Sequence, residues 1–180
     1  QSDESLYLGD RARESIIKNI DFSEKNIIMF ATHGVLSGEL AELYEPGLIL
    51  TPPDTISELD DGILTASEIM ELELNADWVL LSACNTAAGN KPNAEGLSGL
   101  AKAFFYAGSK TLLVSHWAVP SEAAKRLTTG MFAASDADTT IGPAEALRRS
   151  MSELIQDEET MYAHPMFWAP FMVVGEGAAR

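Results

Sequence analysis

Cys84 and His33 are the two residues whose types and positions best suit covalent chemistry. Cys84 ends the largely apolar run 76–83, and His33 directly follows the apolar run 26–32. The thiolate form of a cysteine is the nucleophile, and a free cysteine has a pKa of about 8.5, so it needs a base nearby. A histidine can supply that base. The two residues therefore predict a Cys/His pair for nucleophilic catalysis.

Two buried strands must deliver these side chains. A short apolar run followed by polar sequence is typical of a central parallel strand that is buried on both faces. In open α/β sheets, chemistry gathers just beyond the carboxyl ends of such strands. If the two strands are parallel neighbours, His33 and Cys84 emerge side by side at one edge of the sheet.

The rest of the chain alternates strand and helix signals. A strand at 5–8 precedes a helix capped by Asp10. A helix at 37–44, with Leu40 and Leu43 pointing inward, follows the first buried strand, and a hairpin-like excursion spans 47–64. The later elements are a helix from Thr65, the strand before Cys84, a helix at 97–107, a strand at 111–115, helices from Ser121 and Pro143, and a strand at 165–175. This alternation predicts an α/β fold with a mostly parallel central sheet and helices on both faces.

Two helix starts carry specific signals. Thr65 and Glu68 have the spacing of a capping box, in which the two side chains satisfy backbone N–H groups reciprocally. Pro143 follows Gly142 at the expected first turn of the last helix, where proline is favoured. We therefore expect helices to begin at these two places.

Several kinds of site lack their sequence signature. The acidic residues of 54–61 match no EF-hand loop, and three histidines with one cysteine show no zinc spacing. No phosphate-binding glycine motif and no Gly-x-Ser-x-Gly elbow occurs. We expect neither a metal nor another cofactor, and we interpret the acidic stretch as an exposed loop.

Charge and composition exclude further classes. The 180 residues suit a single domain, and 27 acidic against 12 basic residues give a net charge of −15. Nucleic-acid binding requires basic patches, so no nucleic-acid partner is expected. The sequence contains no run of about 18 apolar residues, which a membrane span would need. No membrane partner is therefore expected either. A lone cysteine leaves no internal disulfide, which favours the reducing cytoplasm.

At this point seven separate motifs resemble the CHAT family, whose caspase-like domains are usually found downstream of tetratricopeptide repeats. The motifs are 30–34 (FATHG), 61–69 (DGILTASEI), 81–87 (LSACNTA), 95–97 (EGL), 101–104 with 107–108 (AKAF, AG), 114–119 (VSHWAV) and 164–171 (HPMFWAPF). They run in one order from about Leu6 to Gly175. The resemblance implies a caspase-like three-layer sandwich.

The resemblance also implies an activity. It points to a cysteine endopeptidase that cleaves a protein or peptide substrate, with Cys84 as nucleophile and His33 as general acid/base. The backbone N–H groups of Gly34 and Cys84 would stabilise the oxyanion. The primary pocket would be bounded by Ser82, Ser115 and Trp117.

The preference of that pocket stays open. Relatives that cut after arginine or lysine often carry an acid at the position of Ser82, and the neutral serine favours an uncharged side chain. The acidic surface favours a basic one. Trp117 fits a pocket wall and a plug of the sheet end equally well.

A second function from another class remains beside the peptidase. A caspase-like scaffold could bind partner proteins while its dyad stays idle or latent. Under both hypotheses we expect the 180 residues to be one CHAT domain of a longer protein, regulated by tetratricopeptide-repeat or sensor modules in the same chain or a partner. The family pattern has a further strand and helix before Leu6, and residues 1–4 lack the features of a signal peptide.

Overall fold

The strands that carry the predicted site lie in one four-stranded sheet of the computed structural model. The structure describes residues 6–57, 59–81, 99–157 and 161–178. The strand order in this sheet is β1-β5-β6-β7. Three strands run parallel and the last, β7, is antiparallel. Their bounds are Ile27–Phe30 for β1, Trp78–Leu81 for β5, Thr111–Ser115 for β6 and Phe171–Gly175 for β7.

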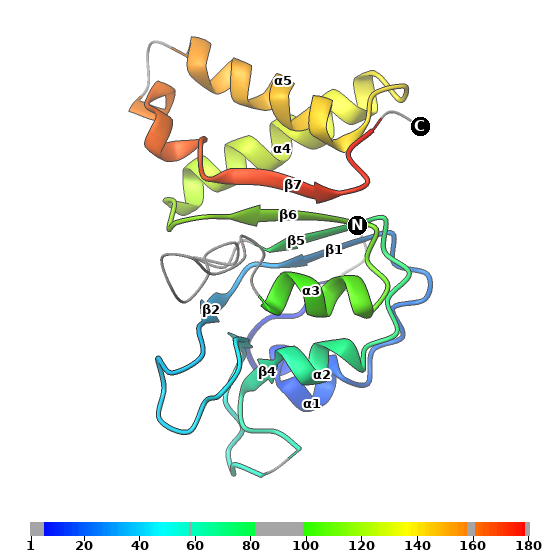
Figure 1. Cartoon of the computed structure of the whole chain (residues 1–180), viewed down its shortest axis with the longest axis vertical. Coiled ribbons are helices and arrows are strands. Elements are labelled where there is room, and N and C mark those ends of the chain that lie inside the picture. Colours follow the sequence, from blue (N-terminus) through cyan, green and yellow to red (C-terminus); the bar gives the residue numbers. More distant parts are fainter. Residues whose placement is uncertain (1–5, 58, 82–98, 158–160, 179–180) are drawn as a thin grey trace.

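Helices cover both faces of this sheet (Figure 1). On one face lie α4 (Ser121–Ala137) and α5 (Pro143–Gln156), and on the other lie α3 (Gly99–Tyr106), α2 (Ala66–Met70) and α1 (Glu14–Ile17). The expected three-layer α/β sandwich is therefore confirmed. No helix in the described ranges combines the length and the apolar character that crossing a membrane requires.

Alternation along the central strands builds two separate cores. On β5, Val79 and Leu81 face the core under α3, whereas Trp78 and Leu80 face the core under α4 and α5. Successive strand residues point to opposite faces, so a strand buried on both faces must be apolar throughout. All four residues of β5 are buried, which explains the unbroken apolar run in the sequence.

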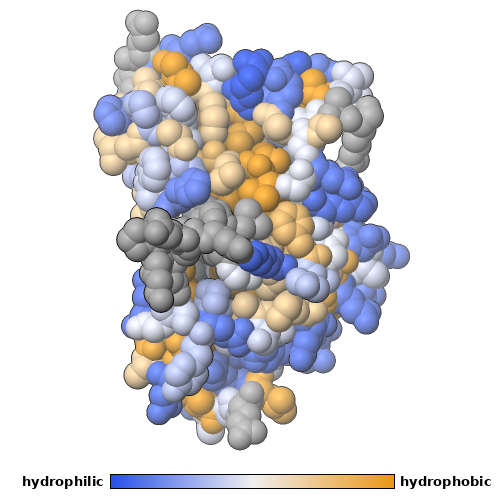
Figure 2. All heavy atoms as spheres, in the orientation of Figure 1, coloured by the Kyte–Doolittle hydropathy of each residue, from blue (hydrophilic) through white to orange (hydrophobic). Residues whose placement is uncertain are grey.

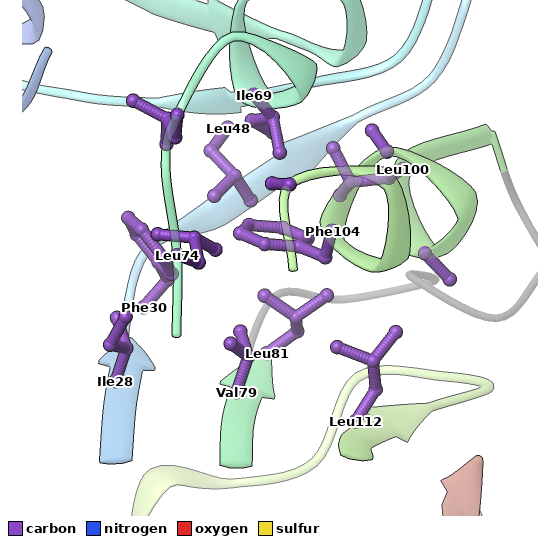
Figure 3. Close-up of a cluster of buried hydrophobic side chains, with 14 of the residues drawn as sticks. Ile28, Phe30, Leu48, Ile69, Leu74, Val79, Leu81, Leu100, Phe104 and Leu112 are labelled. Carbon is purple, nitrogen blue, oxygen red and sulfur yellow. The ribbon is translucent and has the colours of Figure 1, made fainter. Parts of the chain in front are cut away.

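The first core is centred on an aromatic pair (Figure 3). The rings of Phe30 on β1 and Phe104 on α3 lie 5.4 Å apart in a tilted arrangement. Phe104 is fully buried, and it meets leucine and isoleucine side chains from the sheet and from α2. On the face shown in Figure 2, hydrophobic side chains gather near α4 and β7, and hydrophilic ones dominate the periphery.

A second, antiparallel sheet confirms the hairpin-like excursion. It has the order β2-β3-β4, formed by His33–Val35, Gly47–Ile49 and Ile63–Thr65. The capping box that begins α2 is also confirmed, because Thr65 and Glu68 exchange both of its hydrogen bonds. The start of α5 at Pro143 agrees with the sequence prediction as well.

The helix expected at 37–44 is wrong. Gly38 and Glu42 have φ angles of 83° and 66°, in the left-handed region that a right-handed helix does not allow. The segment instead closes on itself, with Gly38 N–H donating to the carbonyl of Leu43 at 2.8 Å. Leu40, which was expected to point inward, is 44% exposed, so no core contact pulls this segment into a helix.

The elements expected at the two chain ends are also partly wrong. Residues 6–8 form no strand, and a 3₁₀ helix at Gly9–Ala12 precedes the single-turn α1. Asp10 caps no helix because it lies inside the 3₁₀ helix, and its carboxylate instead pairs with Arg13 at 3.0 Å. At the other end, a short 3₁₀ helix at Pro165–Phe167, which follows another at Met161–Ala163, replaces the start of the strand expected at 165–175. The strand begins only at Phe171.

Candidate active site

The two strands predicted to carry the reactive residues are parallel neighbours. Phe30 at the end of β1 is paired with Leu81 at the end of β5. In the sequence, His33 lies three residues beyond Phe30 and Cys84 lies three residues beyond Leu81. Cys84 and Ser82 fall outside the described residues, so the closeness of thiol and imidazole stays a prediction.

His33 is held by the small sheet. It is the exposed first residue of β2, and it is paired with Ile49 on β3. The hydroxyl of Thr32, one residue earlier, donates a hydrogen bond to the carbonyl of Ile49. The backbone at His33 is therefore fixed from the side by β3, while its side chain is open to solvent.

Gly34 follows in the same strand and is paired with Leu48. Leu48 is completely buried, so the partner strand is anchored in the core directly beside Gly34. Gly34 itself is half-buried. A glycine here leaves its backbone accessible to a substrate, since no side chain shields it.

Ser115 and Trp117 come to the same edge of the sheet. Ser115 is the buried last residue of β6, which runs parallel to β5, so its carboxyl end faces the same way as those of β1 and β5. Trp117 is 42% exposed, and its indole N–H donates to the carbonyl of Met166 at 3.0 Å. This edge, on the left of the sheet in Figure 1, thus collects His33, Gly34, Ser115 and Trp117.

The anchoring of Trp117 was not predicted from the sequence. Met166 accepts the indole hydrogen bond with its carbonyl, while its own N–H donates to Nδ1 of His164 at 3.2 Å. His116, beside Trp117, places Nε2 3.1 Å from the sulfur of Met172. The only sequence signal was the proline after His164, which marks a turn but not the residue that the turn contacts.

A cavity of about 600 Å³ lies along β1. It is lined mainly by three segments, which are residues 6–9, 27–33 and 49–52. The lining includes exposed apolar side chains such as Leu6, Leu8 and Met29, and among the described residues it contains no carboxylate and no residue of β5. Apolar lining with few polar groups is typical of a ligand-binding cleft. The cleft thus lies alongside β1, and His33 is among the residues that line it.

The backbone of β1 faces this cleft. Trp78 N–H donates to the carbonyl of Asn26 at 3.0 Å, so the alternation of a parallel ladder turns the backbone groups of Ile27 and Met29 away from β5. Within the described ranges no strand pairs with that side of β1. In the same ranges no three histidine, aspartate or glutamate side chains gather closely enough to hold a metal ion.

Comparison with known families agrees with this architecture. A model of the CHAT domain family matches residues 1–176. The chain belongs to the CHAT domain family. Among curated proteins it is similar to the human and mouse tetratricopeptide repeat protein 28, being 31% identical to each over 117 residues, or 65% of this chain. The match covers only 4% of the human protein and 5% of the mouse protein.

The names of these relatives describe a repeat and state no reaction. What the domain does chemically has to be argued from its own residues.

Proposed function

We propose that this CHAT domain is a cysteine endopeptidase of the caspase-like type. Cys84 is the nucleophile and His33 is the general acid/base. The observation that carries the proposal is the parallel register of β1 and β5. Phe30 is paired with Leu81, and His33 and Cys84 each follow three residues after their member of this pair. The exposure of His33 and its place among the residues that line a mostly apolar cleft add to it.

The proposed reaction has two halves. The Cys84 thiolate attacks the scissile carbonyl carbon, and the oxyanion that forms accepts hydrogen bonds from the backbone N–H groups of Gly34 and Cys84. One such donor contributes about 3 kcal/mol to lowering the barrier. As the C–N bond breaks, His33 donates a proton to the leaving amine. Water, deprotonated by His33, then hydrolyses the thioester and releases the thiol.

The substrate is a protein or peptide, and its primary side chain lies in a pocket that Ser82, Ser115 and Trp117 bound. None of these three residues carries a charge, and burying a guanidinium or ammonium without a counter-charge is costly. We therefore propose an uncharged side chain at the cleavage site.

Residues 1–180 form a single CHAT domain of a longer protein in this proposal. The tetratricopeptide repeat proteins among its relatives support repeat modules in the same chain or in a partner as its regulators. The lone cysteine favours a reducing compartment such as the cytoplasm.

The test is covalent labelling of the full-length protein with a peptide that carries a thiol-reactive electrophile. We expect the label on Cys84, and we expect both labelling and cleavage of a peptide library to be lost in Cys84→Ala. In His33→Gln labelling should slow strongly, whereas Ser152→Ala on α5 serves as a control and should label normally. A Cys84 that stays unlabelled under every activating condition, without cleavage of any peptide, would support the idle scaffold that binds partner proteins instead.

A further inference from the structure

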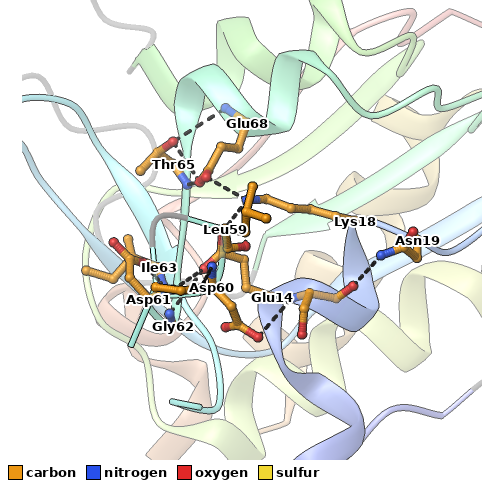
Figure 4. A network of polar contacts seen from close by, with 12 residues as sticks. Glu14, Lys18, Asn19, Leu59, Asp60, Asp61, Gly62, Ile63, Thr65 and Glu68 are labelled. Carbon is orange, nitrogen blue, oxygen red and sulfur yellow. Dashed lines mark hydrogen bonds and ion pairs between the residues drawn. The ribbon is translucent and has the colours of Figure 1, made fainter. Parts of the chain in front are cut away.

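Glu14 is a buried carboxylate that the proposed reaction does not use. The first residue of α1, it is 1% exposed. One of its carboxylate oxygens accepts hydrogen bonds from the backbone N–H groups of Asp61 at 2.9 Å and Gly62 at 3.1 Å. The other accepts from the ammonium group of Lys18 (Figure 4). A single side chain therefore ties α1 to the turn that precedes β4.

Lys18 extends this cluster to a third element. Its ammonium group also donates to a carboxylate oxygen of Glu68 at 2.6 Å and to the carbonyl of Leu59 at 3.3 Å. Glu68 belongs to the capping box at the start of α2. The Glu14 cluster, formed by Glu14, Lys18 and Glu68, thus joins α1, the turn at 59–62 and α2 (Figure 4).

From this turn a short route leads to His33. The carbonyl of Gly62 accepts a hydrogen bond from Leu50 N–H at 2.8 Å. Leu50 directly follows Ile49, which is paired with His33 and whose carbonyl accepts the hydrogen bond from Thr32. Glu14 is consequently separated from the backbone of His33 by two hydrogen-bonded steps and one strand pairing.

The small sheet gives His33 little other support. Within the described residues, β2 lies at the edge of its sheet and pairs only with β3. Two hydrogen bonds hold the chain just after β3 against the segment before Glu14. Thr51 N–H donates to the carbonyl of Ala12 at 3.1 Å, and the Thr51 hydroxyl donates to the carbonyl of Gly9 at 2.7 Å. The position of β3 therefore sets the position of His33.

We propose that Glu14 is a positioning residue for His33: it holds the turn at Asp61 and Gly62 so that β3 presents the imidazole at the sheet edge. A carboxylate suits this task because it can accept from two adjacent turn N–H groups and from an ammonium group at once. Buried ion pairs add little net stability but are costly to break, which fits a role in fixing geometry. The catalytic consequence rests on the proposed peptidase function, whereas the structural coupling does not.

The test combines hydrogen exchange and kinetics on the full-length protein carrying Glu14→Ala. Removing the acceptor leaves the backbone N–H groups of Asp61 and Gly62 without this partner, while Lys18 keeps its bonds to Glu68 and Leu59. We therefore expect exchange in peptides covering 32–36 and 47–63 to speed up by about 10- to 100-fold. Exchange in α4 and α5 should stay as in the wild type. We expect kcat to fall about 10-fold with KM nearly unchanged, because a displaced base weakens the chemical step rather than substrate binding.

Two further variants separate positioning from a general loss of stability. Glu145→Ala is the control: it likewise removes a carboxylate that accepts from cationic side chains, here Arg148 and Arg149, but this carboxylate lies on α5. It should change neither the exchange of 32–36 nor kcat. Glu14→Gln keeps an oxygen for the turn N–H groups and should recover part of the lost kcat. If Glu14→Ala does not fold, Lys18→Met is used instead, because it removes the ammonium group of the cluster. We then expect the same changes in exchange and in kcat, but smaller ones.

Uniformly faster exchange over the whole domain, or unchanged exchange at 32–36 with unchanged kcat, would overturn the proposal. Failure of the peptidase function has a different signature. A wild type that cleaves no peptide refutes the proposed reaction, yet the exchange pattern of Glu14→Ala still decides whether this carboxylate controls the strand that carries His33.

Discussion

Phe30 on β1 lies directly opposite Leu81 on β5 in a parallel pairing. Because parallel strands present their carboxyl ends at the same edge of a sheet, this pairing brings the segments that follow β1 and β5 to neighbouring starting points at that edge. It is the structural basis of the proposed Cys84/His33 pair. It also implies that the core behind the pair controls how well the site is built.

Phe104 should be a main support of that core. Truncating Phe104→Ala removes a fully buried ring that packs against Phe30, and we expect a loss of about 3–5 kcal/mol in the free energy of unfolding. Tyr106→Ala on the same helix removes a side chain that is 80% exposed, and it should cost less than about 0.5 kcal/mol. Denaturant unfolding of both variants provides the comparison, and equal losses would contradict this view of the core.

Catalysis should depend on both members of the proposed pair. Cys84→Ala should abolish cleavage without changing the folded structure, and His33→Ala should lower kcat/KM by about 10³-fold or more, because no other group would carry protons between thiol, amine and water. Steady-state kinetics on the full-length protein, together with far-UV circular dichroism, measures both effects. Substantial cleavage by Cys84→Ala would exclude this nucleophile.

Trp117 should affect substrate binding more than the chemical step. Trp117→Phe keeps an aromatic ring but loses the N–H that donates to Met166, so the ring should reorient and KM should rise several-fold with kcat nearly unchanged. Trp168→Phe is the matched control, because it also loses an indole hydrogen bond, to the carbonyl of Ala163. We expect Trp168→Phe to cost about 1 kcal/mol of stability and to leave KM unchanged.

Acid should weaken α5 through Glu145. Hydrogen bonds from Arg148 and Arg149 lower the pKa of Glu145 from 4.5 to about 2. A carboxyl group whose pKa is lower in the folded state stabilises the fold above its unfolded pKa, and this contribution disappears as the pH falls through the folded pKa. The difference in unfolding midpoint between wild type and Glu145→Gln should therefore be largest above pH 4.5 and vanish near pH 2. A difference that persists unchanged at pH 2 would contradict this assignment.

The open side of β1 should favour self-association. Ile27 and Met29 are 51% and 48% exposed, and within the described residues no strand pairs with their side of β1. An exposed apolar edge of a sheet is a template for pairing with another chain. Met29→Lys should slow aggregation on heating, since a charge on an edge opposes such pairing. Ile16→Lys, on the surface of α1, adds the same charge away from this edge and should have little effect. Light scattering during a thermal ramp distinguishes the two.

Much of this fold could be predicted from the sequence because its signals are local. The apolar runs predicted β1 and β5 as buried strands, the Thr65/Glu68 spacing predicted the start of α2, and Pro143 predicted the start of α5. Each signal rests on backbone preferences and burial patterns within a few residues. The seven CHAT motifs identified the family for the same reason, since they could be read in order along the chain.

Only the tertiary structure decided how these pieces meet. It paired Phe30 with Leu81, set Ile49 beside His33, and placed the buried Glu14 under the turn at Gly62. It also rejected the helix expected at 37–44, where Leu40 had the right spacing but found no core to pack against. Such outcomes depend on contacts between residues far apart in the sequence, and the free energy of those contacts is absent from any local pattern.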